Sequence, residues 1–99
     1  MTEEEIEVVR AAHRYEIRVG GRLAGFTMFH ADEQGRLVFP HTVIDPAFGG
    51  RGLGRALVAR AMADVASRGE TVVPLCPFVA KYLHLTEVPG LTVDWPQAS

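Results

Sequence analysis

A glycine-dense run at residues 48–55, Phe-Gly-Gly-Arg-Gly-Leu-Gly-Arg, has the residue types that bind an anion. It joins a predicted strand over residues 37–45 to a predicted helix over residues 52–68. The first turn of a helix leaves backbone N–H groups without partners, and the helix dipole makes that end positive. Glycines let the backbone approach a phosphate closely, and Arg51 and Arg55 add positive side chains. We therefore interpret the run as a phosphate-binding loop; the alternative is a turn that only packs a helix against a sheet.

Two common phosphate-binding motifs do not fit the run. A GxGxxG dinucleotide fingerprint counted from Gly50 would place its third glycine at residue 55, which is Arg55. A Walker A loop requires Gly-Lys-Ser or Gly-Lys-Thr after the first glycines, and this chain has neither.

Taken together with residues upstream and downstream, the run resembles the GCN5-related N-acetyltransferase superfamily. The pyrophosphate loop of that superfamily reads Gln/Arg-x-x-Gly-x-Gly/Ala. Residues 52–54 match its second half, whereas Gly49 stands where Gln or Arg is usual. A very small branch of the superfamily has three elements in one order, which are present here as His41-Thr42-Val43-Ile44, Arg51-Gly52-Leu53-Gly54 and Cys76 through Tyr82. The resemblance covers residues 15–82.

This resemblance implies an acetyl-CoA-dependent N-acetyltransferase that moves acetyl to an amine, whose identity the sequence does not give. Acetyl-CoA would lie in a gap where two strands of a curved mixed sheet part, over residues 39–45 and 72–76. Pro40 and Pro74 suit such a place because proline cannot donate to a strand ladder. The implied cofactor-binding residues are Val43, Ile44, Gly49, Gly50, Arg51, Gly52, Leu53, Gly54, Arg55, Cys76 and Phe78. The alternative is a non-catalytic acetyl-CoA- or acyl-CoA-binding module or subunit.

Three side chains are candidates for the chemistry. His41 is the best general base, and strand alternation predicts that it shares a face with Phe39 and Val43; it could equally be a half-buried histidine bonded to backbone. Cys76 precedes Pro77 at a predicted helix start, where the dipole favours a thiolate. It could act as nucleophile through an acetyl-cysteine, lie beside the departing CoA sulfur, or be a small buried hydrophobe. The hydroxyl of Tyr82 could protonate the leaving thiolate, or its ring could simply pack. A backbone N–H near Val43 or Ile44 could bind the thioester oxygen.

Composition limits the partners. With 99 residues and a formal net charge of −2, the chain allows one modest domain and offers no basic stripe for nucleic acid. It has no apolar run long enough to span a membrane and no signal-peptide pattern at its start. A single cysteine excludes an internal disulfide and favours a cytoplasmic location. His13, His30 and His84 have no partner at a metal-ligand spacing, so we expect no metal site. The oligomeric state stays open.

The elements that must position these residues follow from periodicity and turn residues. We expect an α/β fold of order βββ-α-β-α with a mixed sheet, in a single domain over residues 1–99. The expected strands cover residues 14–19, 23–30, 37–45 and 71–75, and the helices cover residues 52–68 and 78–85. Residues 1–12 are expected to be a loose lead-in, and residues 89–99 an irregular tail with a last extended piece at residues 91–95.

Overall fold

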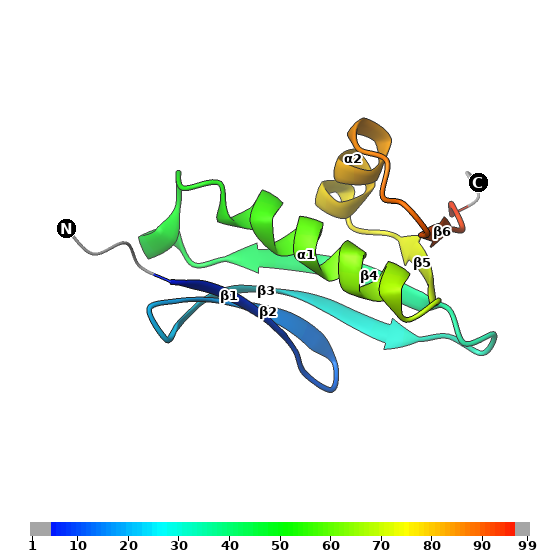
Figure 1. Cartoon of the computed structure of the whole chain (residues 1–99), viewed down its shortest axis with the longest axis horizontal. Coiled ribbons are helices and arrows are strands. Elements are labelled where there is room, and N and C mark those ends of the chain that lie inside the picture. The colour runs from blue at the N-terminus through cyan, green and yellow to red at the C-terminus, as the bar shows by residue number, and fades with distance from the viewer. Residues whose placement is uncertain (1–4, 97–99) are drawn as a thin grey trace.

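The sheet of this protein contains six strands in the order of the chain, as a computed structural model describing residues 5–96 shows (Figure 1). The strands are β1 (Ile6–Arg10), β2 (Arg14–Val19), β3 (Arg22–Ala31), β4 (Leu37–Ile44), β5 (Thr71–Pro74) and β6 (Thr92–Val93). The first four are antiparallel neighbours, whereas β5 runs parallel to β4 and β6 runs parallel to β5. Between the strands lie a short 3-10 helix η1 (Pro46–Phe48) and the helices α1 (Leu53–Ser67) and α2 (Pro77–Leu85). The predicted mixed α/β fold and its order from β2 onward are confirmed.

Strand β1 corrects the expectation that residues 1–12 form a loose lead-in. Ile6–Arg10 pair with β2 along their whole length, from Ile6 opposite Val19 to Arg10 opposite Tyr15. This strand was not predicted from the sequence because acidic residues precede it. Its stability comes from tertiary contacts, because Val8 packs against the core and Arg10 bonds to residues far along the chain. Residues 1–4 of the expected lead-in lie outside the described residues.

Helix α1 lies along one face of the sheet (Figure 1) and supplies the helical half of the core. The predicted stripe is buried, together with the residues expected to widen it: Leu53, Leu57, Val58, Ala61, Met62 and Val65. The helix ends as expected at Gly69, whose φ of +68° is a left-handed conformation that favours glycine. The N–H groups of Gly69 and Glu70 donate to the carbonyls of Ala66 and Val65, which completes a Schellman motif.

The sheet half of the core is aromatic. Tyr15, Phe29 and Phe39 form a cluster with ring centroids 5.5 to 6.3 Å apart. Each ring comes from a different strand, so this cluster joins β2, β3 and β4 beneath α1. The core is therefore continuous from β2 to β4, the strand that carries the candidate site.

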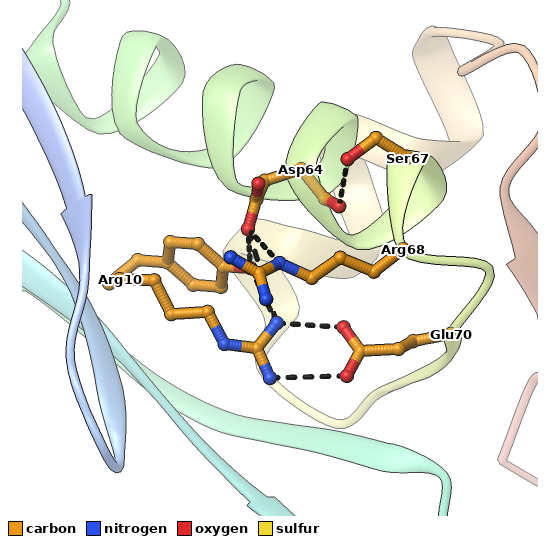
Figure 2. A network of polar contacts seen from close by, with 6 residues as sticks. Arg10, Asp64, Ser67, Arg68 and Glu70 are labelled. Carbon is orange, nitrogen blue, oxygen red and sulfur yellow. Dashed lines mark hydrogen bonds and ion pairs between the residues drawn. The ribbon is translucent and has the colours of Figure 1, made fainter.

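A polar network ties the edge strand to the end of α1 (Figure 2). The guanidinium of Arg10 donates to both carboxylate oxygens of Glu70, at 2.7 and 3.1 Å, and to Tyr15 Oη at 3.0 Å. Tyr15 Oη donates in turn to Asp64 Oδ2 at 2.6 Å, which also accepts from Arg68 Nε at 2.8 Å. Burial and the bond to Asp64 raise the pKa of Tyr15 above its usual value. Because every one of these arginines has a carboxylate partner, we interpret the network as a structural clamp.

Candidate active site

The parallel pairing of β4 and β5 stops partway along β4. Residues Leu37, Val38 and Phe39 pair with Val72, Val73 and Pro74, and one further bond runs from Cys76 N to Phe39 O at 2.8 Å. Strand β4 continues to Ile44 beyond that point, paired on its other side with β3. The prolines at positions 40 and 74 stand where the two strands part, as the sequence predicted. The sheet therefore opens a gap between the second half of β4 and the start of α2.

A bulge at the same point reverses the predicted face of His41. The β3–β4 register shifts between the pairs Met28–His41 and His30–Val38, so β4 gains one residue near Pro40. Phe39 is consequently buried in the core, whereas His41 is exposed and lies opposite the exposed Met28. The expectation that His41 shares a face with Phe39 is wrong, because simple alternation does not hold across a bulge. Its alternation with Val43 and against Thr42 holds.

The backbone of β4 presents hydrogen-bonding groups to the gap. Asp45 N donates to Ala24 O at 2.8 Å, which fixes the phase of the antiparallel ladder with β3. Val43 therefore bonds toward β3 as well, while Thr42 and Ile44 direct their N–H and C=O groups to the β5 side. Of the two predicted donors, Ile44 rather than Val43 has its N–H directed into the gap.

The glycine run forms the start of α1, as predicted. Gly52 is the N-cap, with a φ of +71°, and no side chain caps the helix. Within residues 5–96, the N–H groups of Gly52, Leu53 and Gly54 donate to no other backbone group. These glycines therefore leave a positive, uncapped helix end of the kind that binds anions. Gly49 ends η1, its N–H donating to Pro46 O at 3.1 Å, and Gly50 follows with a φ of +77°.

Helix α2 lies beside this helix start. Gly54 is so close to Phe78 that a Cβ added to it would be 2.9 Å from the ring. The guanidinium of Arg55 lies 5.6 Å from the centroid of the Tyr82 ring. A groove of about 170 Å³ runs between the two helices and is lined by Arg55, Phe78, Lys81, Tyr82 and Leu85. The start of α1 is thus in contact with α2, and Arg55 and Phe78 line the same groove.

Cys76 is the N-cap of α2, with Pro77 as its first residue, as predicted. Its thiol is 5% exposed and makes no bond to its own helix. It donates instead to Thr42 Oγ1 at 3.4 Å, and Thr42 Oγ1 lies 2.9 Å from Thr27 Oγ1. Among the described residues, the thiol has neither His41 nor Tyr82 as a hydrogen-bond partner.

The structure therefore divides the predicted catalytic residues. Cys76 lies at the gap on the helix-covered side of the sheet, whereas His41 is on the uncovered side of β4, and Tyr82 lies under Arg55. Sequence reasoning named Thr42 only as part of a motif and did not consider Thr27. The sequence gives only a weak indication that Thr27 lies near Thr42, because their contact depends on the β3–β4 register that places these two threonines opposite each other.

A mixed sheet that opens between parallel strands, with an uncapped glycine-rich helix start beside the opening, is the arrangement that the resemblance in the motifs implies. A family model described as GCN5-related N-acetyl-transferase matches residues 14–88. The chain belongs to this family, and the resemblance seen in its motifs is confirmed.

Solved structures show the same fold. The chain is similar to the ribosomal-protein-alanine N-acetyltransferase from Brucella melitensis biovar Abortus 2308, with a TM-score of 0.55 and 24% sequence identity. The match covers 87% of this chain but 66% of that one, so this chain spans a little under two thirds of the Brucella protein. No curated protein sequence matches the chain significantly. Within residues 5–96, neither helix is both long and apolar enough to cross a membrane.

Proposed function

We propose that this protein binds acetyl-CoA in the gap between β4 and β5 and transfers its acetyl group to an amine. The observation that carries the proposal is the coincidence of three features at one place. The strands part at Phe39 and Pro74, and the uncapped start of α1 lies at the end of the opening. Ile44 directs its N–H into the opening, where it has no backbone partner within residues 5–96. Acetyltransferases of this superfamily use acetyl-CoA, which supplies an activated thioester, amide groups and a pyrophosphate.

The residues present fit such a ligand. The backbone groups that Thr42 and Ile44 direct to the β5 side match the amides of an extended chain that pairs with β4 like an additional strand. The N–H groups of Gly52 to Gly54 suit a pyrophosphate, because helix starts bind phosphate through backbone donors and the helix dipole. Arg55 adds a cation at the same helix end. Arg51, Gly49 and Gly50 precede this helix start, and Leu53 anchors it through its buried side chain.

The chain's own side chains then divide the proton transfers of the reaction. Breaking the acetyl C–S bond and forming the C–N bond requires that the amine lose a proton and that the departing sulfur gain one. His41, exposed on the uncovered face where the strands part, is placed to accept the proton from an amine arriving on that face. The Ile44 N–H is placed to stabilise the negative charge that develops on the acetyl oxygen. Cys76 and Tyr82, on the helix side, are the candidate proton donors to sulfur.

A second candidate function is a non-catalytic acyl-CoA-binding module. Gly49 favours this alternative, since it provides no side chain where the superfamily usually has Gln or Arg. The uncovered face beside His41 favours it too. Leu23 and Met28 are exposed on β3, so no described element closes an acceptor cleft over that side.

Calorimetric titration of acetyl-CoA, with ATP and NAD as controls, tests the binding proposal first. Selective binding of acetyl-CoA supports it, and no binding contradicts it. Turnover with a panel of amines then separates the two functions, using His41→Ala and Cys76→Ala as variants. The enzyme proposal expects lower turnover in both with acetyl-CoA affinity retained. If all three proteins bind acetyl-CoA and none acetylates any amine, the binding module is the correct function.

A further inference from the structure

Two buried threonine hydroxyls lead from the core to the thiol of Cys76. Thr27 on β3 is fully buried, at 0% exposure, and its Oγ1 lies 2.9 Å from Thr42 Oγ1 on β4. Thr42 Oγ1 accepts from Cys76 Sγ at 3.4 Å. We call these three residues the hydroxyl chain. It ends at the gap, at the only cysteine of the protein.

Stability alone does not require the hydroxyl chain. Thr27 and Thr42 face each other in the β3–β4 register, in the close, non-hydrogen-bonded type of pair that the Asp45–Ala24 bond specifies. Valine has nearly the same shape, has an equal preference for strands and needs no hydrogen-bond partner in a core. Replacing both members of a buried polar pair by apolar groups of the same shape is often neutral or stabilising. The fold therefore does not require these two hydroxyls, which leaves them available for a role at Cys76.

Hydroxyl groups can serve both protonation states of a thiol. A hydroxyl is donor and acceptor at once, and its hydrogen rotates without any movement of heavy atoms. When Cys76 is a thiol, Thr42 accepts its hydrogen and can donate to Thr27. When Cys76 is a thiolate, Thr42 rotates to donate to sulfur and accepts from Thr27. Valine at either position would interrupt this exchange.

The position of Cys76 makes this partner important. The thiol caps α2 in sequence but makes no bond to the first turn of that helix. Its side chain is almost fully buried, so water contributes little to stabilising a charge on sulfur. Among the described residues, Thr42 is the hydrogen-bond partner of the thiol. A hydrogen bond donated by Thr42 should therefore strongly stabilise the thiolate form of Cys76.

We propose that Thr42, supported by Thr27, is a positioning residue that orients the Cys76 thiol at the gap and stabilises its thiolate. The consequence for catalysis rests on the proposed function. There the Cys76 S–H bond breaks as an S–H bond forms on the departing CoA sulfur. Both groups are thiols, so the transfer exchanges one S–H bond for another. The resulting Cys76 thiolate accepts a hydrogen bond from Thr42 and regains a proton from solvent, while the proton that the amine loses goes to His41.

Ultraviolet titration of the thiolate tests the proposal without acetyl-CoA. Since the chain has one cysteine, the signal reports Cys76 alone, and Cys76→Ala supplies the baseline. Thr42→Val should leave about tenfold less thiolate at a given pH, as expected for loss of one hydrogen bond to a charged group. Thr27→Val should cause a smaller change in the same direction. Thr42→Ser and Thr27→Ser keep the hydroxyl and should restore the wild-type titration.

Either of two results would overturn the proposal: an unchanged titration in Thr42→Val, or an equal change in Thr42→Ser. The double variant Thr27→Val/Thr42→Val should unfold at or above the wild-type urea midpoint. This result would distinguish a role in stabilising the Cys76 thiolate from a role in stabilising the fold. If Thr42→Val does not fold, Thr42→Ala provides the same comparison. Calorimetry of Thr27→Val with acetyl-CoA should show wild-type affinity, since Thr27 on β3 has no part in the proposed binding site. Failure of wild-type protein to bind acetyl-CoA would contradict the proposed function while leaving the titration result intact.

Discussion

Gly54 and Phe78 are in direct contact, and their contact sets the distance between the start of α1 and the start of α2. A Cβ at position 54 would lie 2.9 Å from the Phe78 Cζ atom and 3.5 Å from both Cε atoms. Gly54→Ala should therefore displace the Phe78 ring. Because that ring is 45% exposed and can move outward, we expect a loss near the low end for overpacking, about 1 kcal/mol in the free energy of unfolding. Urea denaturation measures this loss.

The same substitution should weaken acetyl-CoA binding, since the displaced ring lines the groove between the two helices. Gly54→Ala/Phe78→Leu provides the matched control. The leucine at position 78 is smaller than phenylalanine, so it makes room for the new methyl group at position 54 and should recover most of the lost stability. Recovery of neither stability nor affinity would show that the glycine is needed for another reason.

Gly52 tests whether the start of α1 binds an anion or only packs. Gly52 and Gly35 both have a positive φ, +71° and +77°, and a Cβ at either would meet nothing within 4 Å. Asp at either position thus adds the same charge and a similar backbone strain, about 1 kcal/mol. Gly35 lies in the β3–β4 turn, which leads into the start of β4 at Leu37, whereas the proposed binding site is at the other end of that strand. We expect Gly52→Asp to lower acetyl-CoA affinity at least about tenfold, because it brings a carboxylate to the phosphate. Gly35→Asp should bind normally, and equal affinity in both variants would support the packing alternative.

The polar network predicts how stability depends on pH (Figure 2). Burial alone would raise the pKa of Asp64, but hydrogen bonds from Tyr15 and Arg68 hold it below its usual value. A carboxylate with a lowered pKa in the folded state contributes stability above its unfolded pKa, about 3.9, and loses it as the pH falls. Urea midpoints should therefore decrease from about pH 5 downward. Asp64→Asn should be less stable at neutral pH and should show a flatter decrease.

Glu33→Gln removes an exposed carboxylate and is the control for that series. Tyr15→Phe should lose about 1 to 2 kcal/mol at neutral pH, since it removes the hydroxyl between Arg10 and Asp64. If Asp64→Asn keeps the full acid dependence, other carboxylates are responsible. Glu16 is the first of these to test, because hydrogen bonds from Arg18 and Arg14 lower its pKa.

The local signals of the sequence predicted the parts of the fold that depend on neighbours in the chain. Helix α1 was predictable because its apolar stripe and Gly69 are local features. The edge strand β1 was not, since Arg10 is stabilised in it by Glu70, on the far side of α1 in sequence. A bond between such distant residues leaves no periodic signal near either of them.

The candidate site shows the same division. Its glycine run, Cys76 and the parting of the strands were visible as motifs and prolines. The face of His41 was not, because the bulge near Pro40 inserts one residue into the alternation. Proline was the available signal, since it tolerates a bulge where a ladder bond is missing. The link between Thr42 and Cys76 required both the register and the end of β5, which only the folded chain brings together.

Gly25 provides a prediction for the gap itself. This glycine lies opposite Ile44, and a Cβ on it would be 2.5 Å from both Val43 O and Ile44 Cδ1. Backbone cannot yield as a side chain can, so Gly25→Ala should push the second half of β4 away from β3. We expect a loss of about 3 kcal/mol in the free energy of unfolding and weaker acetyl-CoA binding, because the Ile44 N–H moves with the strand.

Gly49→Ala is the matched control, since its backbone is extended, with φ −64° and ψ 156°, and a Cβ would meet only Pro46 O at 3.3 Å. It should change stability by less than about 0.5 kcal/mol. Gly25→Ala/Ile44→Val removes the Cδ1 contact but keeps the contact with Val43 O, so it should recover stability only in part. Equal stability of Gly25→Ala and Gly49→Ala in urea denaturation would contradict the prediction, as would wild-type acetyl-CoA affinity of Gly25→Ala in calorimetry. Full stability with weakened binding in Gly25→Ala would instead mean that β4 can shift without cost and that the position of Ile44 alone determines affinity.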